Sequence, residues 1–291
     1  MSDGFLVVDK AGAMTSHDVV AVARKSLGTK KVGHAGTLDP MATGVLVLGF
    51  GNGTRLLQYI TDGDKSYTAT IVLGATTVTD DHEGEVLSTV DASKVSDEAI
   101  SAQLSKMVGV IQQRPSSVSA VKVDGERAYD RVRAGEVFEL EAREVTISQL
   151  DTVAVRHLGD TVEIDIEVTC SAGTFIRAIA RDLGAALNVG GHLRVLRRTR
   201  VAGFPISSAI TFEQLKAGDF TPLVLADVAR TTFASRELAF DEVNELSFGR
   251  PLSANDGDEI FAALSPDNRL IALLKNQEGR AKPIAVFAAA K

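Results

Sequence analysis

One carboxylate in this chain has a setting suited to chemistry. Asp39 lies in the glycine-rich segment GHAGTLDPMATG, immediately before Pro40. A residue that precedes proline is held in an extended conformation, and the glycines at 33, 36 and 44 let another backbone or a ligand come close. The pattern is typical of an acid displayed in a cleft, where it can act as a nucleophile or a base. A turn former whose carboxylate bonds local amides is the alternative.

Two further side chains could serve such an acid. Tyr67 opens an alternating strand and offers a flat face on which a base can stack, with cross-strand packing as the alternative. Arg177, in CSAGTFIRAIARDLG, lies near the start of an expected helix. Its guanidinium could hold a carboxylate through two hydrogen bonds and keep it ionised. The alternative for Arg177 is a surface pair with Asp182 or Glu167.

A basic stretch, GGHLRVLRRTRVAGF, spans residues 190–204. It carries four arginines that cannot all lie in a core: Arg194, Arg197, Arg198 and Arg200. Because almost no acid interrupts them, we interpret the stretch as phosphate-binding. One of the apolar residues between them, Leu193, Val195 or Leu196, could form the wall of a base pocket.

The net charge of −7 is unusual for a protein that binds nucleic acid, but the charges are unevenly spread. Residues 80–98 carry seven acids against Lys94, whereas residues 177–200 carry six arginines against Asp182 alone. This distribution predicts a polarised surface with one face able to hold a polyanion.

Other chemistries lack their residues. The five histidines show no metal-ligand spacing, so no metal is expected. VLVLGFGNGTRLL has Thr54 where a dinucleotide fingerprint needs its third glycine, and no Gly-Lys-Ser/Thr phosphate loop occurs, so no cofactor is expected. Cys170 lies in an apolar alternating segment typical of a core thiol rather than a nucleophile.

The length of 291 residues favours two domains, and 45% hydrophobic with 24% charged residues is the balance of a globular protein. The N-terminus lacks the features of an export signal, and no apolar run is long enough to cross a bilayer, so no membrane partner is expected. A single cysteine suits a reducing compartment, which predicts a cytoplasmic protein.

The hydrophobic periodicity predicts an α+β fold in which strands dominate. Strands are expected at residues 5–9, 44–50, 67–73 and 162–170, and helices after a Ser16 cap and at 175–187. Thr211 and Gln214 form a capping box for a short helix that ends at Gly218. Short strands at 259–264, 270–274 and 284–288 follow a domain boundary near residue 230.

Six segments resemble the bacterial TruB-type tRNA pseudouridine-55 synthases: VVDKAGAMTSHDVV, VGHAGTLDPMATGVLVLGFGNGTRL, DKSYTATIVLG, RPSSVSAVKVDGERAYDRVRAGE, CSAGTFIRAIARDLG and HLRVLRRTRVAGF. They occur in the family's order and cover most of residues 5–204. The resemblance implies a catalytic domain at 1–230 with a mixed, largely antiparallel sheet and flanking helices. It also implies an RNA-gripping insertion at about 112–145 and a small β-rich, PUA-like RNA-binding domain at 231–291.

The resemblance further implies roles for residues. Asp39 is the catalytic aspartate, Tyr67 stacks on the target uracil, and Arg177 pairs with Asp39. The remaining pocket residues are His34, Phe175 and Leu196. The basic residues expected to contact RNA are Lys10, Lys65, Lys122, Arg127, Arg194, Arg197 and Arg198. The chain departs from the family at Ala11, where proline is common, and at Phe175, where tyrosine is frequent.

The implied activity is cofactor-free isomerisation of uridine-55 in the T-arm of tRNA by a monomeric enzyme that flips its target base. Whether Asp39 attacks the sugar, attacks the base or abstracts a sugar proton is left open by the residues. Two other functions compete: a tRNA-binding or tRNA-folding protein on the same scaffold, and an enzyme that acts on a free nucleotide.

Overall fold

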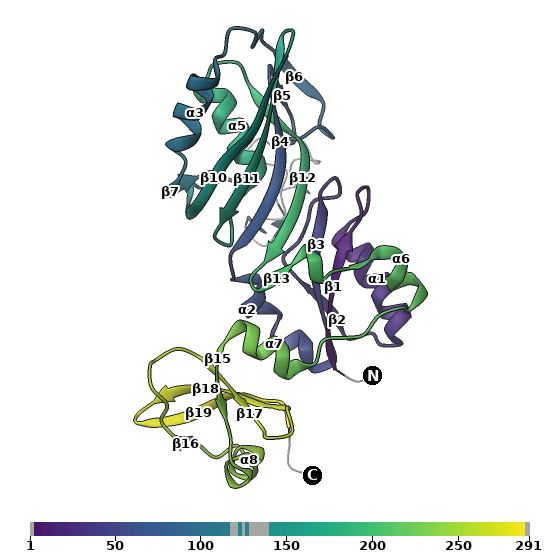
Figure 1. Cartoon of the computed structure of the whole chain (residues 1–291), viewed down its shortest axis with the longest axis vertical. Helices are drawn as coiled ribbons and strands as arrows, with labels where there is room; N and C mark the ends of the chain where they lie inside the picture. Colours follow the sequence, from purple (N-terminus) through teal and green to yellow (C-terminus); the bar gives the residue numbers. More distant parts are fainter. Residues whose placement is uncertain (1–2, 117–121, 124–125, 128–139, 289–291) are drawn as a thin grey trace.

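The computed structural model describes residues 3–116, 122–123, 126–127 and 140–288. A ten-stranded sheet dominates it, with the order β14-β1-β3-β12-β4-β11-β10-β7, while β13 pairs with β12 and β2 with β3 (Figure 1). Its strands are β1 (Gly4–Lys10), β2 (Val32–Ala35), β3 (Thr43–Phe50), β4 (Lys65–Leu73), β7 (Gly109–Gln113), β10 (Arg143–Leu158), β11 (Thr161–Cys170), β12 (Gly191–Val201), β13 (Phe204–Pro205) and β14 (Ile210–Thr211). Only the β1–β14 and β3–β12 pairs are parallel, so the expected mixed, largely antiparallel sheet is confirmed.

Helices cover the two halves of this sheet, as Figure 1 shows. The helical elements are α1 (Ser16–Leu27), η1 (Gly51–Arg55), α2 (Leu57–Thr61), α3 (Asp97–Ser105), α5 (Ile176–Ala186), η2 (Ile206–Ser208), α6 (Phe212–Ala217), α7 (Leu225–Thr232) and α8 (Phe240–Ser247). Buried residues of α1 pack on β1 and β3, and those of α3 and α5 pack on the half that runs from β12 to β7. No helix in the described part of the chain is long and apolar enough to span a membrane.

The expected helices are confirmed, with one correction at a cap. Thr15, not Ser16, caps α1, because its hydroxyl accepts from the Asp18 amide while the Asp18 carboxylate accepts from the Thr15 amide. Ser16 is instead buried, and its hydroxyl exchanges hydrogen bonds with the backbone of Leu38. The capping box of α6 and its end at Gly218 are as predicted.

The basic stretch forms β12, which joins the two halves of the sheet between β3 and β4. The approach of β3 to β12 is very close. Gly44 has φ +101°, and a Cβ there would lie 2.1 Å from the Arg198 carbonyl oxygen. Only glycine fits such a position, so Gly44 is required for the seam next to the Asp39 loop.

Smaller sheets complete the fold. β5 (Ala75–Thr77) pairs with β6 (Val86–Thr89), and β8 (Lys122–Val123) pairs with β9 (Glu126–Arg127). A five-stranded sheet confirms the expected C-terminal β-rich unit. Its strands are β15 (Ala234–Glu237), β16 (Leu252–Ser253), β17 (Phe261–Leu264), β18 (Leu270–Gln277) and β19 (Arg280–Val286).

The C-terminal sheet is packed firmly on the larger one. Phe5 of β1, Ala229 of α7 and Leu273 of β18 belong to one buried hydrophobic cluster. The rings of Tyr59 and Phe233 also meet edge-on, with centroids 5.0 Å apart. Residue 230 lies inside α7, so a division at 230/231 would cut a helix, and this boundary stays a prediction.

We expect Gly44→Ala to lower the free energy of unfolding by more than about 3 kcal/mol, because backbone strain and a steric clash add together. Gly159→Ala is the matched control, since Gly159 also has positive φ but has open space around its Cβ position. That control should cost only about 1–2 kcal/mol. Denaturant unfolding of both variants measures the difference, and equal costs would contradict a steric requirement at the seam.

Candidate active site

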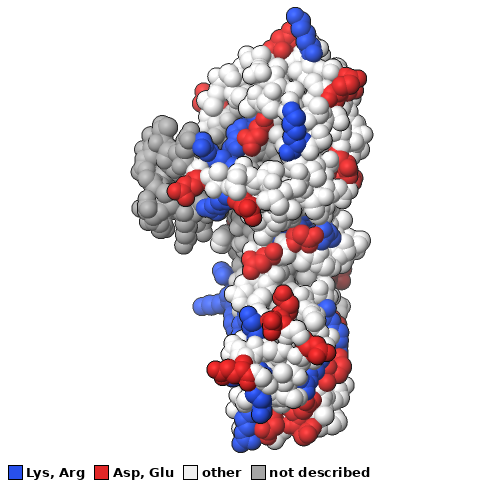
Figure 2. All heavy atoms as spheres, turned by 90° about the vertical axis from the view of Figure 1, so that its left-hand side faces the viewer, with Lys and Arg blue, Asp and Glu red and all other residues white. Residues whose placement is uncertain are grey.

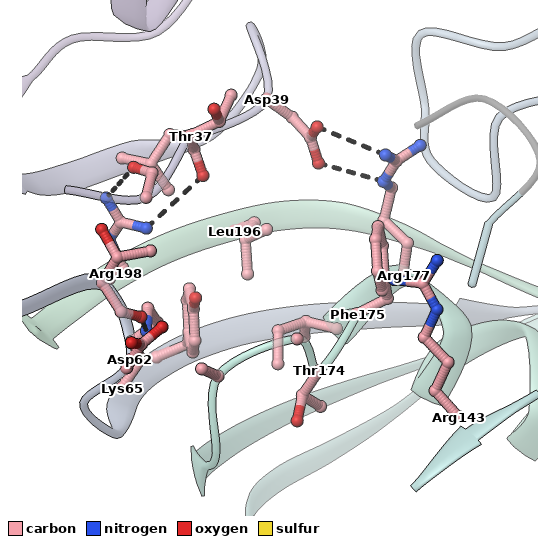
Figure 3. A pocket seen from close by; sticks show the side chains of 17 residues that line it. Thr37, Asp39, Asp62, Lys65, Arg143, Thr174, Phe175, Arg177, Leu196 and Arg198 are labelled. Atoms are coloured by element: carbon pink, nitrogen blue, oxygen red, sulfur yellow. Dashed lines mark hydrogen bonds and ion pairs between the residues drawn. The ribbon is translucent and has the colours of Figure 1, made fainter. Parts of the chain in front are cut away.

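A cavity of about 500 Å³ opens where the loop between β2 and β3 faces β4, β12 and the turn before α5. Asp39, Tyr67, Phe175, Arg177 and Leu196 all line it. Residues separated by more than a hundred positions in the chain therefore meet in one place, as Figure 3 shows for the labelled side chains.

Asp39 is held by Arg177 in a two-point ion pair. Arg177 Nε lies 3.0 Å from Asp39 Oδ2, and Arg177 Nη2 donates to Asp39 Oδ1 at 3.2 Å (Figure 3). The Arg177 side chain is 4% exposed, whereas that of Asp39 is 36% exposed. The guanidinium thus fixes the carboxylate from the protein side and leaves it open to the cavity.

The loop that carries Asp39 is fastened on both sides. Before it, the Leu38 amide donates to Ser16 Oγ at 3.0 Å. After it, Lys10 Nζ donates to the Pro40 carbonyl at 3.2 Å, and the Ala42 amide donates to the Asp39 carbonyl at 3.1 Å. These bonds place the carboxylate with little freedom of the backbone.

A second acid, which the sequence did not single out, contacts Arg177. Asp81 Oδ2 lies 3.4 Å from Arg177 Nη1, which also donates to the Thr79 carbonyl at 2.7 Å. Asp81 is buried and accepts a hydrogen bond from Thr79 Oγ1. The guanidinium therefore lies between two carboxylates. The only sequence signal for Asp81 was its place in the acid-rich segment.

The aromatic and apolar walls lie beside this pair. Tyr67 and Leu196 are buried and line the cavity, and Phe175 is half-buried at its edge. Burial raises the pKa of the Tyr67 phenol, so Tyr67 stays neutral at physiological pH. These faces could hold a flat base against Asp39.

Three residues expected to contact RNA are buried and donate to backbone carbonyls, and their contact with RNA stays a prediction. Lys10 is fully buried and donates to backbone carbonyls, including that of Met14 at 2.7 Å. Lys65 donates to the carbonyls of Thr61 and Gly63 at 2.7 and 2.6 Å. Burial lowers the pKa of each lysine to about 8.

Arg198 is the third. It is 1% exposed and donates to the carbonyls of Val45 and Gly36 at 2.8 and 3.0 Å. Figure 3 shows it beneath the Thr37 end of the Asp39 loop. Such carbonyl-bonded burial makes it a structural cation that supports the loop.

Two other arginines of β12 are neutralised by acids from β1 and β11, which lie one strand beyond its neighbours β3 and β4. Arg194 Nη2 donates to Glu163 at 2.8 Å, and Arg197 Nη2 donates to Asp9 at 2.6 Å. No acid interrupts the basic stretch along the chain, but acids from other strands lie beside its arginines in the fold. Figure 2 likewise shows basic and acidic side chains intermixed on the face it draws. RNA binding by Arg194 and Arg197 stays a prediction.

Three more predicted residues lie elsewhere. His34 is not among the residues that line the cavity, and its role as a pocket residue stays a prediction. Its ring instead meets the His17 ring edge-on at 5.6 Å, and burial lowers the pKa of His34. Lys122 and Arg127 are paired in the β8–β9 ladder, but their side chains lie outside the described residues.

Among the cavity residues that the sequence did not indicate, one is basic. Arg143, the first residue of β10, is exposed at the cavity, and its side chain extends toward the Arg177 end in Figure 3. No acid lies in salt-bridge range of it among the described residues. Nothing in its local sequence marks it, because strand pairing brings it there.

The whole chain matches one family. Residues 24–176 match "TruB family pseudouridylate synthase (N terminal domain)", 177–221 match "tRNA pseudouridylate synthase B C-terminal domain", and 233–288 match "tRNA Pseudouridine synthase II, C terminal". A tRNA pseudouridine synthase B of Arthrobacter sp. (strain FB24) is 52% identical, with 99% of this chain and 97% of that protein covered.

Two other relatives agree. One from Rhodococcus jostii (strain RHA1) is 53% identical over 97% of this chain and 93% of that protein. A solved chain from a Cbf5–Nop10–Gar1 complex has the same fold, with a TM-score of 0.71 at 24% identity over 99% of this chain and 84% of that chain.

We expect Asp81→Asn to lower the turnover of tRNA isomerisation by about 10- to 100-fold, because Arg177 loses one of its two carboxylates and its guanidinium can shift. Asp151→Asn is the control, since Asp151 is exposed on β10 and accepts a hydrogen bond from Gln149 rather than contacting Arg177. Steady-state kinetics on a tRNA transcript measure both. Equal turnover in the two variants would show that Asp81 is dispensable.

Proposed function

This chain belongs to the TruB family and is a tRNA pseudouridine synthase of the B type, an isomerase, and from that premise we propose that it converts uridine-55 in the T-arm of tRNA to pseudouridine with Asp39 as the essential carboxylate. The observation that carries this proposal is the two-point pair of Asp39 with Arg177, which leaves the carboxylate open to a cavity lined by Tyr67 and Leu196.

The proposed reaction needs few groups. The C1′–N1 bond of uridine breaks, the uracil turns, and C5 bonds to C1′. The C5 proton is released and N1 takes up one proton, so substrate and product have the same atoms. An ionised Asp39 supplies the nucleophile or the base for this sequence. Tyr67 and Leu196 keep the detached uracil stacked in a water-poor pocket, so that it is retained while it turns.

A target base must leave its stack before it can reach Asp39, which costs a few kcal/mol. Contacts to the RNA backbone have to offset this cost. With Lys10, Lys65 and Arg198 occupied by carbonyls, we assign part of this work to Arg143 at the cavity. The segment at about 112–145 and the C-terminal unit remain further RNA-binding candidates.

A tRNA-binding or tRNA-folding protein without catalysis is the second candidate. Binding alone gives no reason to hold an acid against a desolvated guanidinium at the bottom of a cavity, because such a pair is costly to bury. The arrangement therefore favours catalysis, and a folding role could coexist with it.

We expect Asp39→Asn to lower turnover by about 10³-fold or more while tRNA affinity changes little, since the amide keeps the shape but loses the charge. Tritium release from 5-tritiated uridine in a tRNA transcript measures turnover, and filter binding measures affinity. Substantial turnover in this variant would refute the proposed role of Asp39.

The same assay tests the position. A transcript with cytidine in place of uridine-55 should release no tritium when it is incubated with the unaltered enzyme. Free uridine monophosphate should not react either. Release from the cytidine-55 transcript would place the target elsewhere.

We expect Arg143→Ala to weaken tRNA binding and to reduce the slope of log affinity against log salt by about 1, as the loss of one phosphate contact predicts. Arg156→Ala on the same strand is the control, because Arg156 is already neutralised by Asp165 and Glu163. Binding titrations at several salt concentrations make the comparison, and identical slopes for both variants would contradict a phosphate contact at Arg143.

A further inference from the structure

The last residue of the edge strand β7 reaches across to the beginning of α5. Gln113 Nε2 donates to the Phe175 carbonyl at 3.1 Å, and the Phe175 amide donates to Gln113 Oε1 at 2.8 Å. One side-chain amide thus satisfies both backbone groups of a single residue. Gln113 is 2% exposed, so these bonds are shielded from water and from competing partners.

A second contact fastens the same segment one turn further along α5. Arg181 Nη2 donates to the Arg114 carbonyl at 2.7 Å, and Arg181 Nη1 lies 3.4 Å from the Pro115 carbonyl. Arg181 is itself held by Asp182 at 2.8 Å. Residues 113–115 therefore dock on α5 at two points.

Besides these contacts, the turn before α5 is held by Thr174 Oγ1, which donates to the Ser171 carbonyl, and by the Ala178 amide, which donates to the Phe175 carbonyl. Phe175 precedes the first turn of α5, where no side chain caps the helix. Just before it, Gly173 is exposed and has φ +84°, with open space around it. Such a turn has freedom to shift unless an outside group sets its place. Gln113 is the side chain that bonds the Phe175 backbone in the described part of the chain.

The turn that Gln113 holds carries one residue of the cavity wall and leads directly to the partner of Asp39. The Phe175 ring lines the cavity, and Arg177 follows two residues later to hold Asp39. A shift of the Phe175 backbone would move the wall of the pocket and the guanidinium together. A misplacement on the order of 1 Å is enough to cost about 100-fold in rate.

We propose that Gln113 is a positioning residue for uridine isomerisation, whose amide clamps the Phe175 backbone and so sets Phe175 and Arg177 against Asp39. This inference rests on the proposed roles of Asp39 and Arg177. It assigns Gln113 no contact with the substrate.

The test is Gln113→Glu, which changes the clamp by a single group. An ionised carboxylate can still accept from the Phe175 amide, but it repels the Phe175 carbonyl to which Nε2 donated. Once protonated, the carboxyl can donate to that carbonyl and restores both bonds. Because burial raises the pKa of a carboxyl, protonation should occur within the range in which the enzyme can be assayed.

Single-turnover rates on a tRNA transcript are compared with those of the unaltered enzyme at each pH, so that other titrations cancel. We expect Q113E to be slower by about 10- to 100-fold at about pH 8, with tRNA affinity changed less than about 2-fold, and its relative rate to rise as the pH falls toward about 5.5.

Gln112→Glu is the matched control, because Gln112 is the preceding residue of the same strand, is exposed, and has no side-chain hydrogen bond among the described residues. Its relative rate should stay close to one at every pH. A Q113E rate equal to that of Q112E at about pH 8, a loss that does not recover at low pH, or a loss matched by weaker tRNA binding would overturn the proposal.

Gln113→Asn covers the case in which Q113E does not fold. Its shorter amide cannot reach both Phe175 groups, so a slower single turnover at unchanged tRNA affinity is expected, and an unaltered rate would overturn the proposal. Turnover by Asp39→Asn is measured in parallel. Activity there would refute the role of Asp39 while leaving the Q113E comparison readable.

Discussion

The site depends on one buried guanidinium and the two carboxylates that neutralise it. Removing an arginine from water is costly unless its charge is paired, and Arg177 is paired with Asp39 and Asp81 and also donates to the Thr79 carbonyl. Each partner comes from a different segment. The β2–β3 loop, the segment after β5 and the first turn of α5 must therefore all be in place before any one of them is stable there.

The surrounding cations show the same constraint in another form. Arg198, Lys10 and Lys65 are buried and form no salt bridge within the described part of the chain. They donate to backbone carbonyls instead and so support the loops around the cavity. The cations that remain for phosphate contact are those, such as Arg143, that lie at the cavity and form no salt bridge with any acid that the structure describes.

Charge order along the chain was a poor guide to the surface. The acid-rich segment at 80–98 and the arginine-rich segment at 177–200 suggested two opposite faces, yet Asp80 and Asp81 lie against Arg181 and Arg177. Acidic and basic segments that are far apart in the sequence therefore lie against each other in the fold, because their opposite charges attract. The same reasoning failed for the basic stretch, because its acids come from β1 and β11.

The sequence by itself determined four strands of the large sheet, β1, β3, β4 and β11, and the helices α1, α5 and α6, because these depend on local periodicity and local caps. It also placed an acid, a tyrosine and an arginine in motifs specific enough to give the family. The tertiary structure decided the rest. Contacts across the sheet decide whether Arg198 contacts RNA or supports a loop. They also decide whether His34 reaches the cavity, and they bring Asp81, Arg143 and Gln113 to the site. Burial and pairing of this kind arise between segments far apart in the chain, so no local pattern encodes them.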